Sequence, residues 1–208
     1  MIEGHEDKVY RLKKSLYGLK QAPKAWYSRI DSYLIRISNN EPTLYTKVNK
    51  QGQILIVCLY VDDMIFTRNL SVDKFKANTK QEFEMTDLGL MRYFFSIEVL
   101  QSYLGIFVFQ ARYVMDVLKR FKMMNCKPTL TPIAIGTKLR KEDVGSNADP
   151  KLFKRLIDSL MYLIVTRLDI MYVVILISRF IESPKDSHWQ VRKIIMRYIV
   201  GTIGYHIL

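Results

Sequence analysis

Two adjacent carboxylates, Asp62 and Asp63, interrupt a long apolar segment of this 208-residue chain. The residues before them, Ile54–Tyr60, form a continuous apolar run rich in β-branched side chains, and the apolar pattern resumes at Met64–Phe66. Runs of this kind are typical of buried strands, and a short polar break between two of them indicates a β-hairpin. We therefore predict a hairpin whose turn carries two acidic side chains.

Two carboxylates at one turn are costly unless a cation neutralises them, because like charges a few ångströms apart resist joint ionisation. Magnesium is bound by one or two carboxylates plus substrate phosphates, and a pair of such ions can hold the attacking and leaving oxygens of phosphoryl transfer. Asp62 and Asp63 are therefore candidate ligands of Mg²⁺ or Mn²⁺. An ordinary hairpin with a solvated acidic turn explains the residues Tyr60–Asp63 equally well when they are taken alone.

The charge of the chain favours a polyanionic partner. Its 32 Lys and Arg residues against 20 Asp and Glu residues leave a net charge of +12, which makes nucleic acid the first candidate. A membrane is the second candidate, but the longest apolar stretch, Ile170–Ile177, is far shorter than the roughly 20 residues of a spanning helix. We predict a buried helix there and no membrane partner. No secretory or organelle signal is visible at the N-terminus, so an intracellular location is expected.

The periodicity of the apolar residues predicts an α+β fold. An alternating pattern over Tyr93–Val99 predicts a strand, with Ile106–Phe109 as the return strand of a second hairpin. Asp149 before Pro150 predicts a helix start, with a capping carboxylate and a proline in the first turn. Helices are expected over residues 23–37, 71–83, 113–121, 150–164 and 191–201.

The segment Lys127–Asp149 contains several prolines and glycines and no sustained period, which indicates a linker between two lobes. In the last helix, one apolar face predicts the buried side, and Arg192, Lys193 and Arg197 are expected to face outward.

Several blocks of the sequence resemble those of copia-type retrotransposon reverse transcriptases. The hairpin Leu59–Ile65 resembles the polymerase signature, and Ser15–Tyr27, with its Gln-Ala-Pro triplet, resembles the family's most specific block. Further similar blocks follow at the expected separations: Phe83–Gly89, Gly105–Phe107, Thr166–Ile170 with Ser178–Phe180, and Arg197–Thr202. Coincidence is implausible because these independent blocks occur in one order over nearly the whole chain.

The resemblance implies a partial polymerase palm over residues 1–109, built from an antiparallel sheet with helices, and a helical thumb and connection lobe over residues 110–208. It implies RNA-directed DNA polymerisation, with an RNA or DNA primer-template and deoxynucleoside triphosphates as partners. By the same resemblance, the protein is expected in a cytoplasmic virus-like particle or in the nucleus.

Site residues follow from the resemblance. Asp62 and Asp63 are expected to be catalytic and to bind the metal ions, close to the N-terminal end of the helix that follows Gln21. Gly18, Gln21, Tyr60 and Val61 are expected at the nucleotide, although Gly18 and Gln21 alone more often indicate a helix-entry turn with a surface amide. Phe94, Phe95 and Ser96 are expected in a hairpin that grips the primer.

Basic clusters are expected to contact the nucleic-acid backbone, since sequence-independent binding depends on phosphate contacts. Any one cluster taken alone is more often a solvated face. The residues are Lys13, Lys14, Lys20, Lys24, Lys119, Arg120, Lys122, Arg192, Lys193 and Arg197.

The sequence also departs from the family. The family takes another metal-binding aspartate from a segment upstream of the Gln-Ala-Pro triplet, and this chain has no such segment, so a bridging ligand would be lost. Ser96 and Asp158 stand where the family usually has glycines, and Leu168 replaces a proline. The family continues into a ribonuclease H domain where this sequence stops, so that activity is not expected of these 208 residues. We therefore expect the chain to be inactive alone, and a non-catalytic nucleic-acid-binding remnant or an inert remnant stays open.

Overall fold

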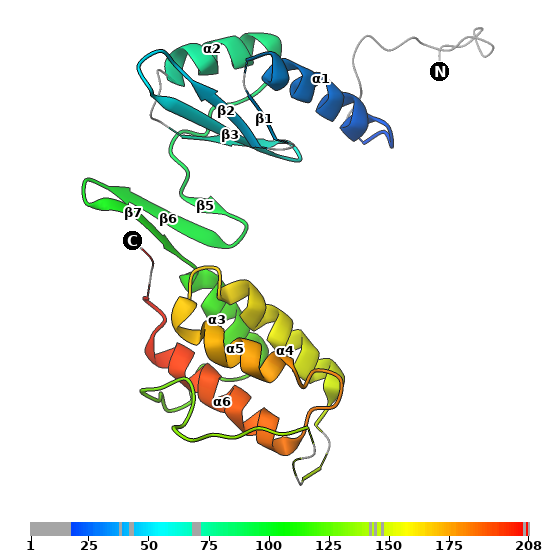
Figure 1. Cartoon of the computed structure of the whole chain (residues 1–208), viewed down its shortest axis with the longest axis vertical. Coiled ribbons are helices and arrows are strands. Elements are labelled where there is room, and N and C mark those ends of the chain that lie inside the picture. The colour runs from blue at the N-terminus through cyan, green and yellow to red at the C-terminus, as the bar shows by residue number, and fades with distance from the viewer. Residues whose placement is uncertain are drawn as a thin grey trace, which may run out of the picture. The chain divides into compact units, whose positions relative to one another are not determined.

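A computed structural model describes residues 18–37, 39–41, 44–67, 72–141, 143, 145–146, 148–205 and 207. The fold is α+β, as predicted, with helices and two small antiparallel sheets (Figure 1). The chain divides into two compact units between Gly89 and Leu90. The assignment of residues 1–109 to a palm and of residues 110–208 to a thumb and connection lobe stays a prediction.

The first unit is a four-stranded antiparallel sheet covered on one face by two helices. The strands lie in chain order, β1 (Asn39–Glu41), β2 (Leu44–Val48), β3 (Ile54–Tyr60) and β4 (Asp63–Phe66). The helices α1 (Ala22–Ile37) and α2 (Val72–Glu82) pack on the sheet (Figure 1). The predicted acidic hairpin and both predicted helices are confirmed for the described residues; Ser71, the expected start of the second helix, lies outside them.

The two faces of strand β3 differ in burial among the described residues. Successive side chains of a strand point to opposite faces. Leu55, Val57 and Leu59 are buried beneath the helices, whereas Ile54 and Tyr60 on the other face are exposed. The buried cluster of this unit also includes Ile30, Leu34, Tyr45, Val72, Phe75 and Phe83.

The second unit begins with a three-stranded antiparallel sheet of β5 (Tyr93–Phe94), β6 (Ile97–Ser102) and β7 (Gly105–Phe109). The predicted hairpin with its return strand is confirmed. The expectation of one strand over Tyr93–Val99 is wrong, because the chain turns back at Phe95 and Ser96. The apolar alternation continues through the turn, so periodicity did not reveal it. Val108 and Ile207 exchange two backbone hydrogen bonds, of 2.9 and 3.0 Å, at the other edge of β7.

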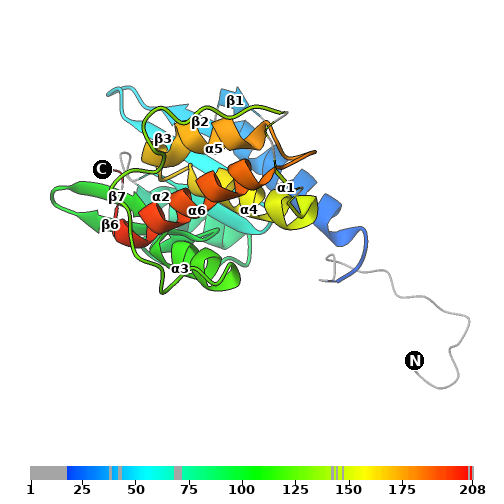
Figure 2. The ribbon, with the colours of Figure 1, turned by 90° about the horizontal axis from the view of Figure 1, so that it is seen from below.

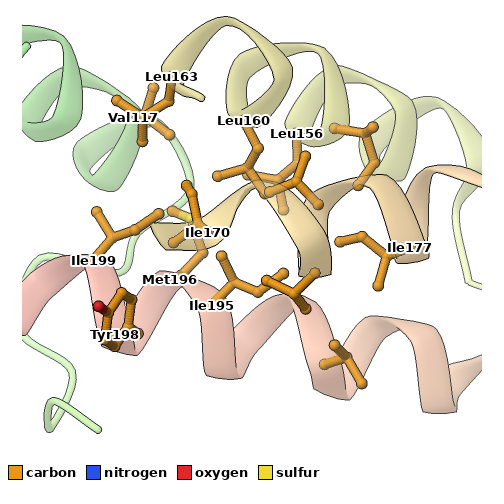
Figure 3. Packing of buried hydrophobic residues seen from close by; sticks show 14 of the residues in the cluster. Val117, Leu156, Leu160, Leu163, Ile170, Ile177, Ile195, Met196, Tyr198 and Ile199 are labelled. Carbon is orange, nitrogen blue, oxygen red and sulfur yellow. The ribbon is translucent and has the colours of Figure 1, made fainter. Parts of the chain in front are cut away.

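The rest of the second unit consists of packed helices around one apolar core (Figure 2). The helices are α3 (Ala111–Arg120), α4 (Pro150–Leu163), the short 3-10 helix η1 (Leu168–Ile170), α5 (Met171–Ser178) and α6 (Asp186–Gly201). Figure 3 shows side chains from these elements meeting in the core, among them Val117, Leu156, Leu160, Leu163, Ile170, Ile177, Ile195, Met196, Tyr198 and Ile199.

Helix α4 begins as predicted. The Asp149 carboxylate accepts the backbone N–H groups of Lys151 and Leu152 at 2.9 and 3.3 Å, and Pro150 occupies the first turn. The cap satisfies donors that have no partner inside the helix, and the proline lacks an N–H at a position where none is needed. A cap and an N1 proline therefore located this boundary correctly from the sequence.

The prediction that residues 127–149 separate two lobes is wrong. The described part of this segment contains no helix or strand, as expected. However, Ile133 and Leu139 pack against the core of the second unit, and the boundary between the units lies at Gly89 instead. Prolines and glycines end regular structure, but they do not determine whether the segment then packs on its own unit.

Helix α5 is buried on one side only. Val173, Val174 and Ile177 lie in the core, as the predicted buried helix requires, but Tyr172 is 71% exposed and Ile175 is 43% exposed. The uniform apolar run concealed this difference between the two sides. Within the ranges that the structure describes, no helix is long and apolar enough to cross a membrane.

A buried arginine links the start of η1 to the end of α6. The Arg167 guanidinium, 2% exposed, donates from Nε and Nη2 to the two carboxylate oxygens of Asp169 at 2.9 and 2.8 Å. It also donates to the Thr202 carbonyl at 2.9 Å and the Thr202 hydroxyl at 2.5 Å. Fork-to-fork pairing of this kind is geometrically specific. Leu168, where the family usually has proline, is 60% exposed, so this departure leaves the pair intact.

The buried side chain of His188 makes the stability of the second unit dependent on pH. Its Nδ1 accepts the Lys185 backbone N–H at 2.9 Å, its Nε2 lies 3.1 Å from the Arg140 carbonyl, and its ring stacks on Phe180 with centroids 3.8 Å apart. Burial lowers the pKa of His188 below its ordinary value, although the Arg140 carbonyl and Asp143 oppose this. The folded chain therefore holds the neutral imidazole.

We expect the free energy of unfolding to fall as the pH drops below about 6.5, where the unfolded histidine binds a proton that the folded one does not. The slope from this one group is at most about 1.4 kcal/mol per pH unit. Urea unfolding between pH 7.5 and 5.5 measures it, and His188→Gln should flatten the dependence. An unchanged slope in that variant would show that other groups cause the loss.

Candidate functional site

The acidic turn has a strained backbone. Tyr60 pairs with Asp63 across β3 and β4, so Val61 and Asp62 form a two-residue turn. Val61 has a φ of +50°, which a β-branched residue rarely adopts. A positive φ at the first central residue alone is the pattern of a type II′ turn, where glycine is normal. Non-glycine residues keep such a conformation only where their surroundings enforce it, and they cluster at functional sites.

Both carboxylates of the turn are available to a ligand. Asp62 and Asp63 are exposed, and neither side chain makes a hydrogen bond or an ion pair with a described residue. Carboxylate oxygens are suitable donors for Mg²⁺ or Mn²⁺. Among the described residues, no group of three or more His, Cys, Asp or Glu side chains is placed to hold a metal ion. The pair of aspartates therefore stays a candidate donor set, as the sequence predicts.

Helix α1 supports the hairpin from the covered face of the sheet. The Tyr45 hydroxyl donates a hydrogen bond to the Asp31 carboxylate at 2.5 Å, and burial and this carboxylate raise the pKa of Tyr45. Trp26 near the start of α1 and Met64 directly after the turn pack against the same buried cluster. The helix and the hairpin therefore share one core, which fixes the strands that flank the aspartates.

The residues expected at the nucleotide lie at two places in the first unit. Gly18 and Gln21 are exposed just before α1; Gly18 has a φ of +90°, and the Gln21 carbonyl accepts the N–H of Ala25 at 3.1 Å. Tyr60 and Val61 are 50% and 65% exposed at the acidic turn. Their role at a nucleotide, and the closeness of Gln21 to the aspartates, stay predictions.

A second strained turn lies at the expected primer-gripping hairpin. Phe94 pairs with Ile97, so Phe95 and Ser96 form another two-residue turn, with φ values of +46° and +59°. Positive φ at both central residues is the pattern of a type I′ turn. The glycine that the family usually has in place of Ser96 would adopt this conformation without strain. The Tyr162 hydroxyl of α4 donates a hydrogen bond to the Phe95 carbonyl.

The predicted phosphate contacts differ in exposure. Lys119, Arg120 and Lys122 are exposed at the C-terminal end of α3, where cations also interact favourably with the helix dipole. Lys20 and Lys24 are exposed, and Lys193 and Arg197 are half-buried. Lys13 and Lys14 lie outside the described residues.

The expectation that Arg192 faces outward is wrong. Its side chain is 5% exposed, and its guanidinium lies 3.5 Å from the centroid of the Trp189 ring. Its Nε has no hydrogen-bond partner among the residues that the structure describes, and burial lowers the pKa of Arg192 to about 10. Arginine is rarely buried without a partner, so the residue type alone predicted an exposed side chain. Trp189 lies three positions earlier on the same helix face, and this spacing could have predicted that the Arg192 guanidinium stacks on its ring.

Comparison with known proteins decides the family of the chain. The sequence profile described as "Reverse transcriptase (RNA-dependent DNA polymerase)" matches residues 1–135, which include the acidic turn and the Gln-Ala-Pro triplet. The chain belongs to the reverse transcriptase family. Within this family it belongs to the copia-type branch, as the sequence blocks indicated, because its relatives are Pol polyproteins of copia-type transposons.

Two plant relatives match almost the whole length of the chain. The retrovirus-related Pol polyprotein from transposon TNT 1-94 of Nicotiana tabacum is 34% identical over 98% of the chain, and that from transposon RE1 of Arabidopsis thaliana is 36% identical over 96%. The chain spans only 16% and 14% of their lengths. A putative transposon Ty5-1 protein of Saccharomyces cerevisiae is 28% identical over 96% of the chain and is covered over 67% of its own length. No solved structure matches the chain.

Proposed function

We propose that this chain acts in RNA-directed DNA polymerisation, with Asp62 and Asp63 as the ligands of Mg²⁺ or Mn²⁺ in a two-metal nucleotidyl transfer. The observation that carries the proposal is a pair of exposed aspartates that make no hydrogen bond or ion pair with a described residue, at a strained hairpin turn of a chain that belongs to the reverse transcriptase family. When bound, the divalent ions would offset the negative charge of the reacting phosphate.

Residues of the first unit would position the reactants around this turn. Tyr60 and Val61 flank the aspartates and are exposed, so they are available to the nucleotide and the primer end. Gly18 lacks a Cβ, which leaves room for close approach, and the Gln21 amide can donate to and accept from a sugar or base. Phe94, Phe95 and Ser96 would hold the primer strand through their turn.

The partners are a primer-template and deoxynucleoside triphosphates. The exposed cluster at the end of α3, with Lys20 and Lys24, supports contacts with phosphate groups. The family takes a further metal-binding aspartate from upstream of the Gln-Ala-Pro triplet, and the 208-residue sequence contains no matching segment. This polypeptide by itself is therefore not expected to extend primers.

A second candidate function is nucleic-acid binding without catalysis. The exposure of Lys119, Arg120 and Lys122, together with the net charge of +12, favours it, because duplex binding needs cations rather than a metal site. Metal binding at the acidic turn separates the two candidates.

We expect Mn²⁺ to broaden the backbone amide NMR signals of Tyr60–Asp63 selectively, because the two free carboxylates are the proposed ligands. Excess Mg²⁺ should reverse the broadening, and Asp62→Asn should abolish it. Asp116→Asn, which removes an exposed carboxylate from α3, is the matched control and should leave it unchanged. Equal broadening in the wild type and in Asp62→Asn would refute the metal role of the turn and leave the non-catalytic function.

A further inference from the structure

The turn at Phe95 and Ser96 needs support from elsewhere in the protein. Two consecutive non-glycine residues with positive φ are unfavourable, and they persist only where the surrounding structure over-determines them. Within the turn, the Phe94 and Phe95 rings meet edge to face with centroids 4.4 Å apart. Phe95 is 47% exposed, so this ring contact is made at the surface of the protein.

Helix α4 supplies a contact to the backbone of the turn. The Tyr162 hydroxyl donates a hydrogen bond to the Phe95 carbonyl, 67 residues earlier in the chain. The Tyr162 ring is itself held, because it meets the ring of Tyr113 edge to face at a centroid distance of 5.1 Å. The Tyr113 hydroxyl donates to the Ser159 carbonyl at 3.2 Å. The Tyr162 hydroxyl, which donates to the turn, is therefore held by contacts between α3 and α4.

A second attachment holds the strand that leaves the turn. The Glu98 carboxylate accepts the Arg112 backbone N–H at 2.9 Å at the start of α3 and pairs with the Arg112 Nε at 3.2 Å. The Arg112 guanidinium lies 5.6 Å from the centroid of the Tyr93 ring. With β6 fixed at α3 and the turn fixed at α4, the hairpin and the helices of the second unit are joined at two separate points.

We infer that Tyr162 is a positioning residue for the turn at Phe95 and Ser96, acting through the Phe95 carbonyl rather than by touching the primer. The inference rests on the proposed function of that turn in holding the primer. The hydroxyl fixes where the turn presents its backbone, whereas affinity for the duplex comes mainly from phosphate contacts made elsewhere. Its removal should therefore change the position and mobility of the turn much more than the amount of duplex bound.

The test compares Tyr162→Phe with Tyr113→Phe. Each variant loses one hydroxyl that donates to a backbone carbonyl and keeps its aromatic ring, but only the first contacts the turn. Amide hydrogen exchange should rise roughly tenfold at Phe95–Ile97 in Tyr162→Phe, as expected for loss of about one hydrogen bond's net contribution, and stay unchanged in Tyr113→Phe. The dissociation constant for a primer-template duplex, measured by fluorescence anisotropy, should stay within about twofold in both variants.

A second measurement links the turn to the primer. Saturating primer-template should slow the exchange of the wild-type Phe94–Ser96 amides, and Tyr162→Phe should lose this protection although it binds the duplex. Equal exchange in the two variants, or full protection in Tyr162→Phe, would overturn the positioning role alone. No protection in the wild type, with duplex demonstrably bound, would overturn the proposed primer contact of the turn and the inference with it.

Discussion

The substitution Asp62→Asn should slow primer extension at least about a thousandfold, which corresponds to ~4 kcal/mol in the activation free energy. The expectation applies to the 208-residue chain joined to the upstream polymerase region of its relative from transposon TNT 1-94. Asparagine keeps the shape of the aspartate but removes the charge that a divalent ion requires. Because Asp62 is exposed and makes no hydrogen bond or ion pair with a described residue, Asp62→Asn should change duplex affinity by less than about twofold.

Extension of a labelled primer with Mg²⁺ or Mn²⁺ gives the rate, and anisotropy with the same preparation gives the duplex affinity. Asp116→Asn serves as the control for loss of an exposed carboxylate and should extend primers like the wild type. More than a tenth of the wild-type rate in Asp62→Asn would refute its role as a metal ligand. Extension by the unjoined chain, lost on chelation and in Asp62→Asn, would show that no further carboxylate is needed.

The elements with strong periodicity were predictable from the sequence. The helix α4 was located from its capping aspartate and proline, and the acidic hairpin from the apolar runs on both sides of Asp62, because burial of one face imposes a period on the residues. The Gln-Ala-Pro triplet and the acidic turn also indicated the family, and the family match over residues 1–135 confirms it.

The features that the sequence did not reveal depend on contacts between distant residues. The positive φ values at Val61 and Phe95 are unfavourable for these residue types, so local propensity argues against them. Tyr162, which supports the second turn, lies 67 residues beyond Phe95 and was not among the predicted site residues. Arg192 was placed outward by its charge, but tertiary packing buries it against Trp189. The properties of single residues could not have shown that Tyr162 contacts Phe95 or that Arg192 packs against Trp189.

Duplex binding should weaken steeply with salt, and the cluster at the end of α3 should account for a defined part of that dependence. Each phosphate contact releases condensed counterions, so the logarithm of the association constant should fall with the logarithm of the salt concentration with a slope of roughly −0.9 per contact. Replacing Lys119, Arg120 and Lys122 together by glutamine should make the slope shallower by up to about 2.7. The affinity lost between 50 and 200 mM salt would then differ about fortyfold between the two proteins.

The matched control replaces three other exposed lysines, Lys47, Lys50 and Lys74, by glutamine. It removes the same net charge from the first unit, so it corrects for the long-range field of the protein. Because Lys119 and Arg120 also favour the end of α3, each by about 0.3–1 kcal/mol, binding must be measured well below the melting temperature of each variant. Equal slopes in the two triple variants would mean that net charge alone drives binding, whereas a shallower slope confined to the α3 variant places phosphate contacts at that helix end.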